Sequence, residues 1–345
     1  MIKDKNILIF RFSAMGDVAL AAAAMKEVVH QNPNNTYWIV TRPKFSIFFK
    51  NIPFVKLLAV DLEKEFMGAK GILKLYRKVA SVNPDIIIDL HENLRTRILK
   101  LFFSIKKTPF LVFDKGRTEK KSLVKNKSFK QLKHTTERYL DVFKRANIIT
   151  ETEISTDVYP ILDFKKKNGL EVFENKKLIG IAPFAQHINK MWPLGKYKEL
   201  SVKIQNEFPG YELIFFGGGK KEFELIESFT TNNSKWHNVI GKFDLETELS
   251  LIANLSVMVC GDSSNMHFAA LSGIPVVSIW GSTHHFAGFG PLFQNPENIV
   301  EINKKELECR PCSVYGNKPC ARGDLACLEH ISSDMVLSKL KTILF

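Results

Sequence analysis

The chain has 345 residues, of which 45% are hydrophobic and 25% charged, as in an ordinary globular protein large enough for two domains. No apolar run approaches the roughly 18 residues that span a bilayer, and no signal-peptide pattern is visible, so we expect a cytoplasmic protein with at most peripheral membrane contact. The formal net charge is +13, and its excess lies in residues 1–150, where 29 Lys and Arg face 13 Asp and Glu.

Apolar segments alternate with helix-forming segments through the first half. The pattern predicts strands at 5–12, 36–43 and 55–61, a strand that runs into a polar turn within 84–96, and helices at 13–33 and 134–148. A charged, irregular stretch over 150–177 suits a linker.

The alternation then restarts. It predicts a strand and loop at 177–185, a strand and Gly-rich loop at 211–219, and strands at 237–242, 257–260 and 276–280. The helices are expected at 194–208, 223–229, 245–255 and 266–271. Strands that alternate with helices in two successive halves predict an α/β protein with two doubly wound parallel sheets. Ligands of such sheets bind beyond the carboxyl ends of the strands, so polar side chains at those positions are candidate site residues.

Asp17 is the first candidate, in the turn "SAMGD" that follows the first strand. The turn lacks the three glycines of a dinucleotide-binding fingerprint. Asp17 suits the positive end of a helix dipole, and it also suits a general base that removes a proton from a hydroxyl. The two roles are compatible.

The second half offers three polar loops. Lys190 precedes a predicted helix and is either solvated or a point charge for phosphate. A glycine turn, 217–219, follows the strand "LIFF" and permits close approach of a ligand to the backbone. The stretch "GDSSNMH" (261–267) places two hydroxyl groups at a helix start, where free N–H groups bind anions.

The lysine-rich block 106–133 carries much of the excess positive charge. It is either a solvated loop or a surface for an anionic partner such as acidic lipid or acidic glycan. Nucleic acid is the weaker choice, because no recognised nucleic-acid-binding motif is present.

Four segments together resemble glycosyltransferase family 9, the ADP-heptose:lipopolysaccharide heptosyltransferases: "RFSAMGDVALAAAAMKEV", "DLHENLRT", "KMWPLGKY" and "GDSSNMHFAALSGIPVVSIWGST". The resemblance implies a GT-B architecture, two Rossmann-like doubly wound parallel-sheet domains facing a central cleft. We expect an acceptor domain at 1–165, a nucleotide-sugar domain at 166–330 and a C-terminal helix at 331–345 that packs back on the first domain.

The resemblance also implies roles for individual residues. Asp17 matches the family's proposed general base, and Lys190 its phosphate-binding lysine. The expected donor-binding residues are Lys190, Gly218, Asp262, Ser263, Ser264 and His267; the expected acceptor-binding residues are Ser13, Arg42, Asn93, Arg95, Lys120 and Lys121. The chain departs from the family pattern at 183–185, which lacks hydroxyl groups, and at 218–220, which lacks an acidic residue for the ribose.

The implied function is inverting transfer of a heptose or related sugar, from a nucleotide-diphosphate donor such as ADP-heptose, to an anionic lipopolysaccharide inner-core acceptor. The enzyme would need no metal or other cofactor and would work at the cytoplasmic surface of the inner membrane. The alternatives are another donor, a capsule or O-antigen acceptor, a sugar-nucleotide epimerase of the same architecture, and a non-catalytic binding protein.

Four cysteines, Cys309, Cys312, Cys320 and Cys327, form a C-x2-C-x7-C-x6-C cluster, while Cys260 lies in an apolar strand. The cluster suggests a structural zinc site, free or redox-active thiols, or disulfides, and its later spacings are not those of a zinc finger or ribbon.

Overall fold

The computed structural model describes residues 1–164 and 169–345. By their internal contacts these residues divide into two units, 1–117 with 133–161 and 118–132 with 162–345. Each unit is built on a parallel sheet.

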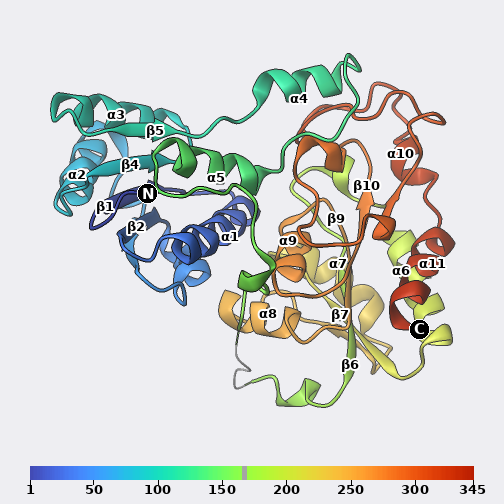
Figure 1. Ribbon diagram of the computed structural model, residues 1–345. Coiled ribbons are helices and arrows are strands. Elements are labelled where there is room, and N and C mark those ends of the chain that lie inside the picture. Colours follow the sequence, from blue (N-terminus) through green and yellow to red (C-terminus); the bar gives the residue numbers. More distant parts are fainter. Residues whose placement is uncertain (165–168) are drawn as a thin grey trace. The chain divides into compact units, whose positions relative to one another are not determined.

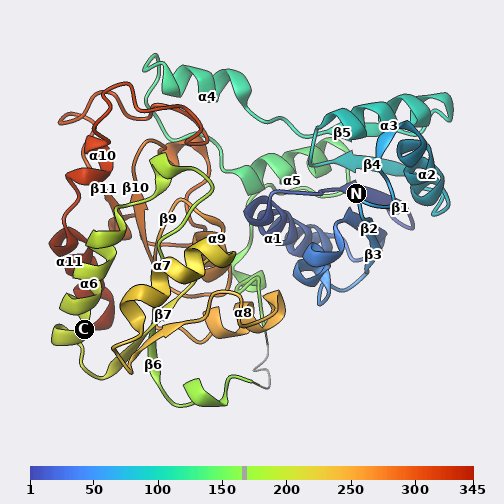
Figure 2. The same ribbon diagram turned by 180° about the vertical axis from the view of Figure 1, so that it is seen from behind.

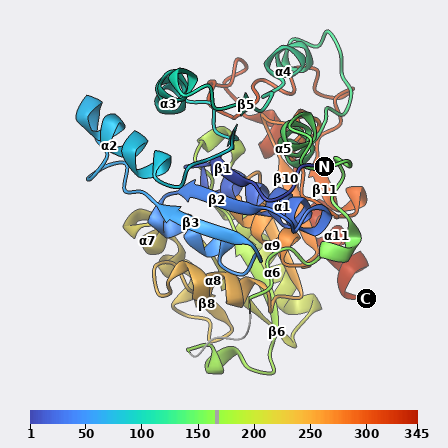
Figure 3. The same ribbon diagram turned by 60° about the vertical axis from the view of Figure 1, so that its left-hand side comes forward.

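The sheet of the first unit has the strand order β3-β2-β1-β4-β5. Its strands are β1 (Asn6–Phe10), β2 (Thr36–Thr41), β3 (Val55–Ala59), β4 (Ile86–Asp89) and β5 (Phe110–Val112), and all neighbouring pairs are parallel. Figure 3 shows β1, β2 and β3 side by side. The chain order reverses between β1 and β4, so this unit has its ligand-binding switch point there.

Helices cover both faces of this sheet, which explains why its central strands are apolar throughout. The helices are α1 (Met15–Gln31), α2 (Gly68–Ala80), α3 (Leu94–Ile105) and α5 (Thr135–Arg145). Leu75 of α2 and Leu99 and Phe103 of α3 pack on Leu8 and Phe10 of β1. The Ala-rich helix α1 instead contacts α5, and Figure 1 shows both pairs of helices side by side.

The sheet of the second unit has the order β11-β10-β9-β6-β7-β8. Its strands are β6 (Lys177–Ala182), β7 (Tyr211–Phe215), β8 (Trp236–Asn238), β9 (Val257–Gly261), β10 (Val276–Trp280) and β11 (Ile299–Glu301). Counted within the unit, this is the 3-2-1-4-5-6 arrangement of a dinucleotide-binding fold, with its switch point between β6 and β9.

The helices of the second unit are α4 (Arg117–Val124, from Thr118 onward in this unit), α6 (Leu194–Glu207), α7 (Lys220–Thr230), α8 (Leu245–Ile252), α9 (Ser264–Leu271), α10 (Ala326–Glu329) and α11 (Ser333–Leu344). Helix α11 packs along α6, as Figure 2 shows, and Val336 and Leu340 enter the same core as Leu200 and Ile204. Residues 331–345 thus belong to the second unit, and their expected packing on the first domain stays a prediction. The apolar face of α11 is already buried within the second unit.

The division of the chain also differs from the expected one. Residues 118–132, from the lysine-rich block, belong to the second unit, and the expected boundary at 165/166 lies outside the described residues. The block is not an irregular loop throughout, because it contains β5 and α4, and Leu123 is buried. Among the described residues, no helix is long and apolar enough to cross a membrane.

Candidate functional site

Asp17 lies in the first turn of α1, directly beyond β1, and is held by Arg11. An Arg11 Nη2 lies 2.7 Å from Asp17 Oδ2. Arg11 is itself buried, donates to the carbonyl of Leu90 and lies 5.6 Å from the ring of Tyr139. The Asp17 side chain keeps 30% of its surface exposed. The ion pair therefore fixes the direction of a carboxylate that a substrate can still reach.

The other side of this switch point is the turn after β4. Asp89 Oδ1 accepts from the backbone N–H groups of His91 and Glu92, at 2.8 and 2.9 Å, which shapes the turn. Burial, reinforced by the positive charges of Arg11 and Lys115, lowers the pKa of His91 to about 3, although Asp17 opposes the shift. His91 is therefore a neutral imidazole at neutral pH. Its buried Nδ1 has no hydrogen-bond partner among the described residues.

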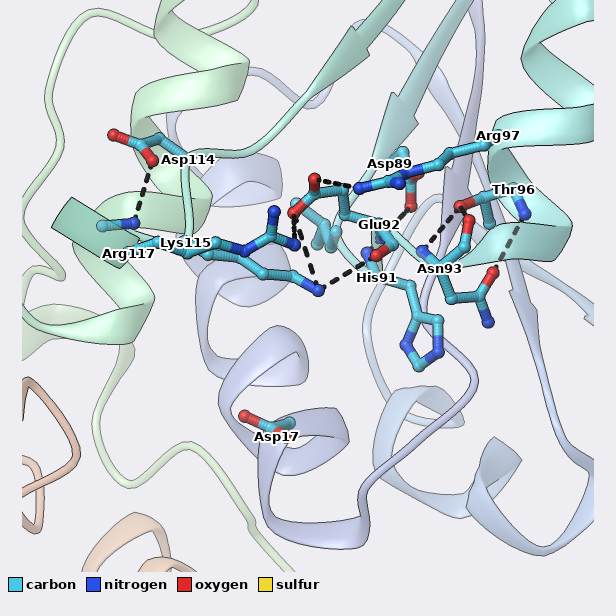
Figure 4. Close-up of polar contacts among 12 residues, drawn as sticks. Asp17, Asp89, His91, Glu92, Asn93, Thr96, Arg97, Asp114, Lys115 and Arg117 are labelled. Carbon is cyan, nitrogen blue, oxygen red and sulfur yellow. Dashed lines mark hydrogen bonds and ion pairs between the residues drawn. The ribbon is translucent and has the colours of Figure 1, made fainter. Parts of the chain in front are cut away.

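Glu92 is the centre of a cationic cluster in the same unit (Figure 4). Arg97 and Arg117 reach its two carboxylate oxygens at 3.0 and 2.9 Å, and Lys115 lies 3.6 Å away. Burial lowers the pKa of Lys115, and the nearby Arg117 and Arg11 add to the shift against the opposing effect of Glu92. Three cations around one carboxylate leave a positive surplus, which favours an anionic ligand at this edge of the sheet.

The structure places the remaining predicted acceptor residues of the first unit in different roles. Arg42 pairs with Glu63 at 2.8 Å, and burial together with nearby Arg42 lowers the pKa of Arg95. The backbone of Ser13 hydrogen-bonds His91. Asn93 caps α3, accepting from the N–H of Thr96 at 2.9 Å. Its side-chain oxygen is therefore engaged in forming the helix.

Lys120 and Lys121 lie on α4 and belong to the second unit, whereas the other predicted acceptor residues belong to the first unit. The Lys120 side chain is buried, and its ammonium lies 4.1 Å from the centre of the Phe289 ring. Lys121 is exposed. Lys120 thus stabilises the attachment of α4 by a cation–π contact.

In the second unit, Lys190 follows β6 and Asp262 follows β9, on the two sides of the switch point. Lys190 Nζ lies 2.9 Å from Asp262 Oδ2, and both side chains are largely buried. The same carboxylate oxygen accepts from the hydroxyl of Thr283, also at 2.9 Å. Asp262 therefore holds a lysine ammonium and a threonine hydroxyl together just beyond the strands.

The N-terminus of α9 lies beside this pair in the sequence. Ser263 is the N-cap residue, but its side chain makes no capping hydrogen bond, and its buried Oγ has no partner among the described residues. Ser264 begins the helix, and His267 is buried one turn inside it. A helix start with an uncommitted hydroxyl next to a lysine is suited to a phosphate group.

An acidic side chain contacts the glycine loop after β7, and the sequence pattern did not identify it. The N–H of Gly218 donates to Glu222 Oε2 at 2.7 Å. Glu222 lies in the first turn of α7, and its carboxylate folds back over the loop. The loop therefore presents a carboxylate after all, supplied from four residues further along the chain.

The family model described as "Glycosyltransferase family 9 (heptosyltransferase)" matches residues 72–318, well over half of the chain. The chain belongs to glycosyltransferase family 9. Among its curated relatives, the lipopolysaccharide core heptosyltransferase OpsX of Haemophilus influenzae is 24% identical over 322 residues, covering 88% of this chain and 86% of the relative.

Solved structures agree in fold with this family 9 chain. The glycosyl transferase family 9 protein of Veillonella parvula gives a TM-score of 0.76 at 18% identity and covers 100% of this chain and 98% of that one. The E. coli heptosyltransferase WaaC with ADP gives 0.66 at 15% identity, covering 98% and 99%. The two parallel α/β sheets thus have the GT-B fold of heptosyltransferases.

One further cluster in this family 9 protein has the composition of a metal site: His284, His285 and Glu301, whose ligand atoms lie within 4.8 Å of one another. The His284 Nδ1 accepts from the N–H of Phe286, which leaves the proton on Nε2, 3.3 Å from Glu301. Glu301 also pairs with the buried Arg310 at 3.1 Å. Because His284 and Glu301 already bond to other protein groups, we interpret the cluster as a structural ion-pair network.

The four cysteines of the C-terminal segment lie near enough to affect one another. Burial raises the pKa of Cys327 to about 11, with Cys312, Cys320 and Cys309 adding to the shift. No three of these sulfur atoms lie within 4.8 Å of one another in the described part of the chain. The structural zinc site at Cys309, Cys312, Cys320 and Cys327 stays a prediction.

Sequence reasoning missed several residues at these two switch points: Arg11, His91 and Lys115 in the first unit, and Glu222 and Thr283 in the second. Arg11 and Thr283 each lie next to an apolar strand, and only their partners, Asp17 and Asp262, identify them. Only their position in the chain could have identified all five, because each lies within a few residues of a strand end or a helix start.

Proposed function

We propose that this chain transfers a heptose from ADP-heptose to an anionic sugar of a lipopolysaccharide inner core, with inversion at the anomeric carbon. Membership of family 9 supports the reaction class. The single observation that carries the donor assignment is the Lys190–Asp262–Thr283 cluster at the switch point of the second sheet, followed by the N-terminus of α9. The solved WaaC structure contains ADP, which supports adenosine as the nucleoside.

Asp17 is the proposed general base. It removes the proton from the acceptor hydroxyl while that oxygen forms a bond to the anomeric carbon and the bond from that carbon to the diphosphate oxygen breaks. Arg11 keeps the carboxylate directed for this step. Attack opposite the leaving group inverts the configuration, through an oxocarbenium-like state such as that of glycoside hydrolysis.

Lys190, the N–H groups at the start of α9 and the Ser263 and Ser264 hydroxyls stabilise the negative charge on the departing diphosphate. His267 supports this loop, and Glu222 beside Gly218 is a suitable acceptor for ribose hydroxyl groups. With these groups in place, the proposed reaction uses the nucleotide-sugar as substrate and no metal or other cofactor.

The acceptor binds, in this proposal, at the cationic cluster around Glu92 in the first unit, where Lys115, Arg97 and Arg117 supply the positive charge. Arg42 and Arg95 extend the same sign of charge. A core sugar that carries phosphate or carboxylate groups matches this surplus. The chain would work in the cytoplasm, against the inner face of the membrane that anchors such an acceptor.

A mass-spectrometric assay tests the proposal. The purified chain is incubated with ADP-heptose, UDP-glucose or GDP-mannose, with and without a truncated lipopolysaccharide core, and with Asp17→Asn as the inactive control. We expect a core product heavier by one heptose only with ADP-heptose. Transfer from another donor overturns the donor assignment, and donor turnover without an acceptor indicates an epimerase.

A further inference from the structure

We propose that Gly316, with the segment around it, positions the Lys190 side chain for the diphosphate group of the donor. The inference rests on the donor site proposed above and extends it to a residue far along the chain. Gly316 lies in the cysteine-bearing segment, 126 positions after Lys190 in the sequence.

The close approach of the two residues requires a glycine. A Cβ atom on Gly316 would lie 2.5 Å from Lys190 Cγ and 2.6 Å from Cδ. These atoms are in the middle of the lysine side chain, so moving the ammonium alone cannot relieve the overlap. Either the lysine stem or the segment at Gly316 has to shift, and turning of the stem would take Nζ from its place 2.9 Å from Asp262.

A second glycine fixes the main chain of Lys190. A Cβ atom on Gly261, the last residue of β9, would lie 2.7 Å from the carbonyl oxygen of Lys190. The end of the central strand therefore sets where the backbone of Lys190 runs, and Gly316 sets where its stem can go. Both constraints act on the residue whose charge meets the leaving group.

Hydrogen bonds tie Gly316 to the loop that carries Lys190. The buried Asn189, the residue before Lys190, donates from Nδ2 to the carbonyls of Gly316, at 3.4 Å, and Lys318. The N–H of Gly316 donates to Ser313 Oγ at 2.8 Å. These bonds attach the Lys190 loop to the cysteine-bearing segment.

Arg310 links the same segment to the other partner of Asp262. Its guanidinium is fully buried and donates to the carbonyls of Gly281, Trp280 and Thr283, at 2.7, 3.0 and 3.3 Å. Thr283 is the residue whose hydroxyl bonds Asp262. One segment, residues 310–318, thus holds both the ammonium and the hydroxyl that meet at this carboxylate.

Gly316→Ala tests the inference, with Gly323→Ala as a matched control. Both glycines have positive φ, +77° and +80°, so alanine introduces similar backbone strain at each, but a Cβ on Gly323 meets nothing within 4 Å. Calorimetry with ADP should show affinity reduced about tenfold or more in Gly316→Ala, the size expected for a displaced charge-assisted contact. Gly323→Ala should bind ADP like the parent, with a similar loss of thermal stability. Equal ADP affinity in the two variants overturns the proposal.

A double-mutant cycle separates positioning of Lys190 from general damage to the loop. Lys190→Ala removes the stem, so the added methyl group of Gly316→Ala meets no lysine methylene, and the second substitution should change ADP affinity less than twofold in that background. An undiminished effect of Gly316→Ala on top of Lys190→Ala overturns the proposal. If Lys190→Ala alone leaves ADP affinity unchanged, the proposed donor site fails, and that outcome is distinct from a failure of the Gly316 inference.

Discussion

Arg11 and Asp17 form an ion pair of 2.7 Å that connects the residue following β1 with the first turn of α1. Arg11 is buried and anchored by a second bond to the carbonyl of Leu90, next to β4. Asp17, in contrast, remains partly exposed. The anchored arginine therefore holds the proposed base at the switch point of the first sheet, where a substrate is expected.

The role of Asp17 predicts a large effect on catalysis and a small one on donor binding. Asp17→Asn and Asp17→Ala should lower kcat by roughly 10²–10⁴-fold, the usual contribution of a general base. ADP affinity, measured by calorimetry, should stay within twofold of the parent, because the donor residues belong to the other unit. Near-normal turnover in both variants would reduce Asp17 to a helix-terminal residue.

The donor site predicts a graded series in the second unit. Lys190→Met keeps the methylene stem and removes the charge, and it should weaken ADP binding by about tenfold or more. His267→Ala should weaken it less, because His267 lies one turn inside α9, whereas the Lys190 ammonium lies beside Asp262 directly beyond the strands. Lys198→Met, at an exposed lysine of α6, is the control. ADP titrations that fail to distinguish the three variants would contradict the assignment.

His91 predicts a stability that depends on pH. Its pKa is about 3 in the folded protein, against an ordinary value near 6.5, so the unfolded chain binds more protons between these values. The contribution of neutral His91 is therefore fully present above about pH 6.5 and is lost as the pH falls towards 3. His91→Gln should flatten the fall in stability between pH 7 and pH 4.5, measured by urea unfolding. A parallel decline in variant and parent would show that His91 does not titrate in this way.

The lysine-rich segment predicts salt-sensitive binding to anionic membranes. Lys120 is excluded from the test because it is buried against Phe289, so the variant is Lys121→Glu, Lys125→Glu and Lys127→Glu. Each lysine near an anionic leaflet contributes on the order of 1 kcal/mol to membrane binding. Binding of the triple variant to phosphatidylglycerol vesicles should therefore fall by orders of magnitude.

The matched control for this membrane test reverses three exposed lysines elsewhere in the same unit, Lys198, Lys235 and Lys305. It should retain most vesicle binding, and neither variant should lose ADP affinity. Similar losses in both variants would mean that only net charge matters. No loss in either would identify the segment as ordinary solvated surface.

The cysteines should differ in reactivity with a thiol reagent. Partial burial opposes ionisation of Cys320, but backbone N–H groups of Leu325, Arg322 and Gly323 outweigh it and lower its pKa. Burial raises the pKa of Cys260 and Cys327. Mass spectrometry after brief labelling at pH 7 should find Cys320 modified early and these two only after unfolding. A stoichiometric bound metal that protects all four clustered thiols would instead support the zinc alternative.

Local patterns in the sequence were sufficient for the central parts of both sheets. The apolar runs at β1, β2, β4, β6, β7, β9 and β10 are long and bounded by polar turns, so their period and their ends are visible without a structure. Helices α2, α3 and α4 and strands β5 and β11 were not predicted. Strands β5 and β11 have three residues each, and α4 carries more charge than apolar surface, so packing decides their form.

The candidate site residues also fall into those that the sequence pattern shows and those that depend on packing. Asp17, Lys190, Asp262 and the serines that follow were visible because they interrupt apolar patterns at strand ends, where parallel sheets bind ligands. Their partners, Arg11 and Thr283, and the neutral state of His91 were not visible, because they depend on which residues burial brings together.

The sequence by itself determined the alternation of strands and helices, the positions of the polar turns and the family to which the chain belongs. Each of these features depends on residues that are neighbours along the chain. Only the tertiary structure decided the strand order, the assignment of residues 118–132 to the second unit and the contact of Gly316 with Lys190. These depend on packing between segments that are more than a hundred residues apart in several cases. Close packing is set by the shape of both partners, and neither segment carries that information alone.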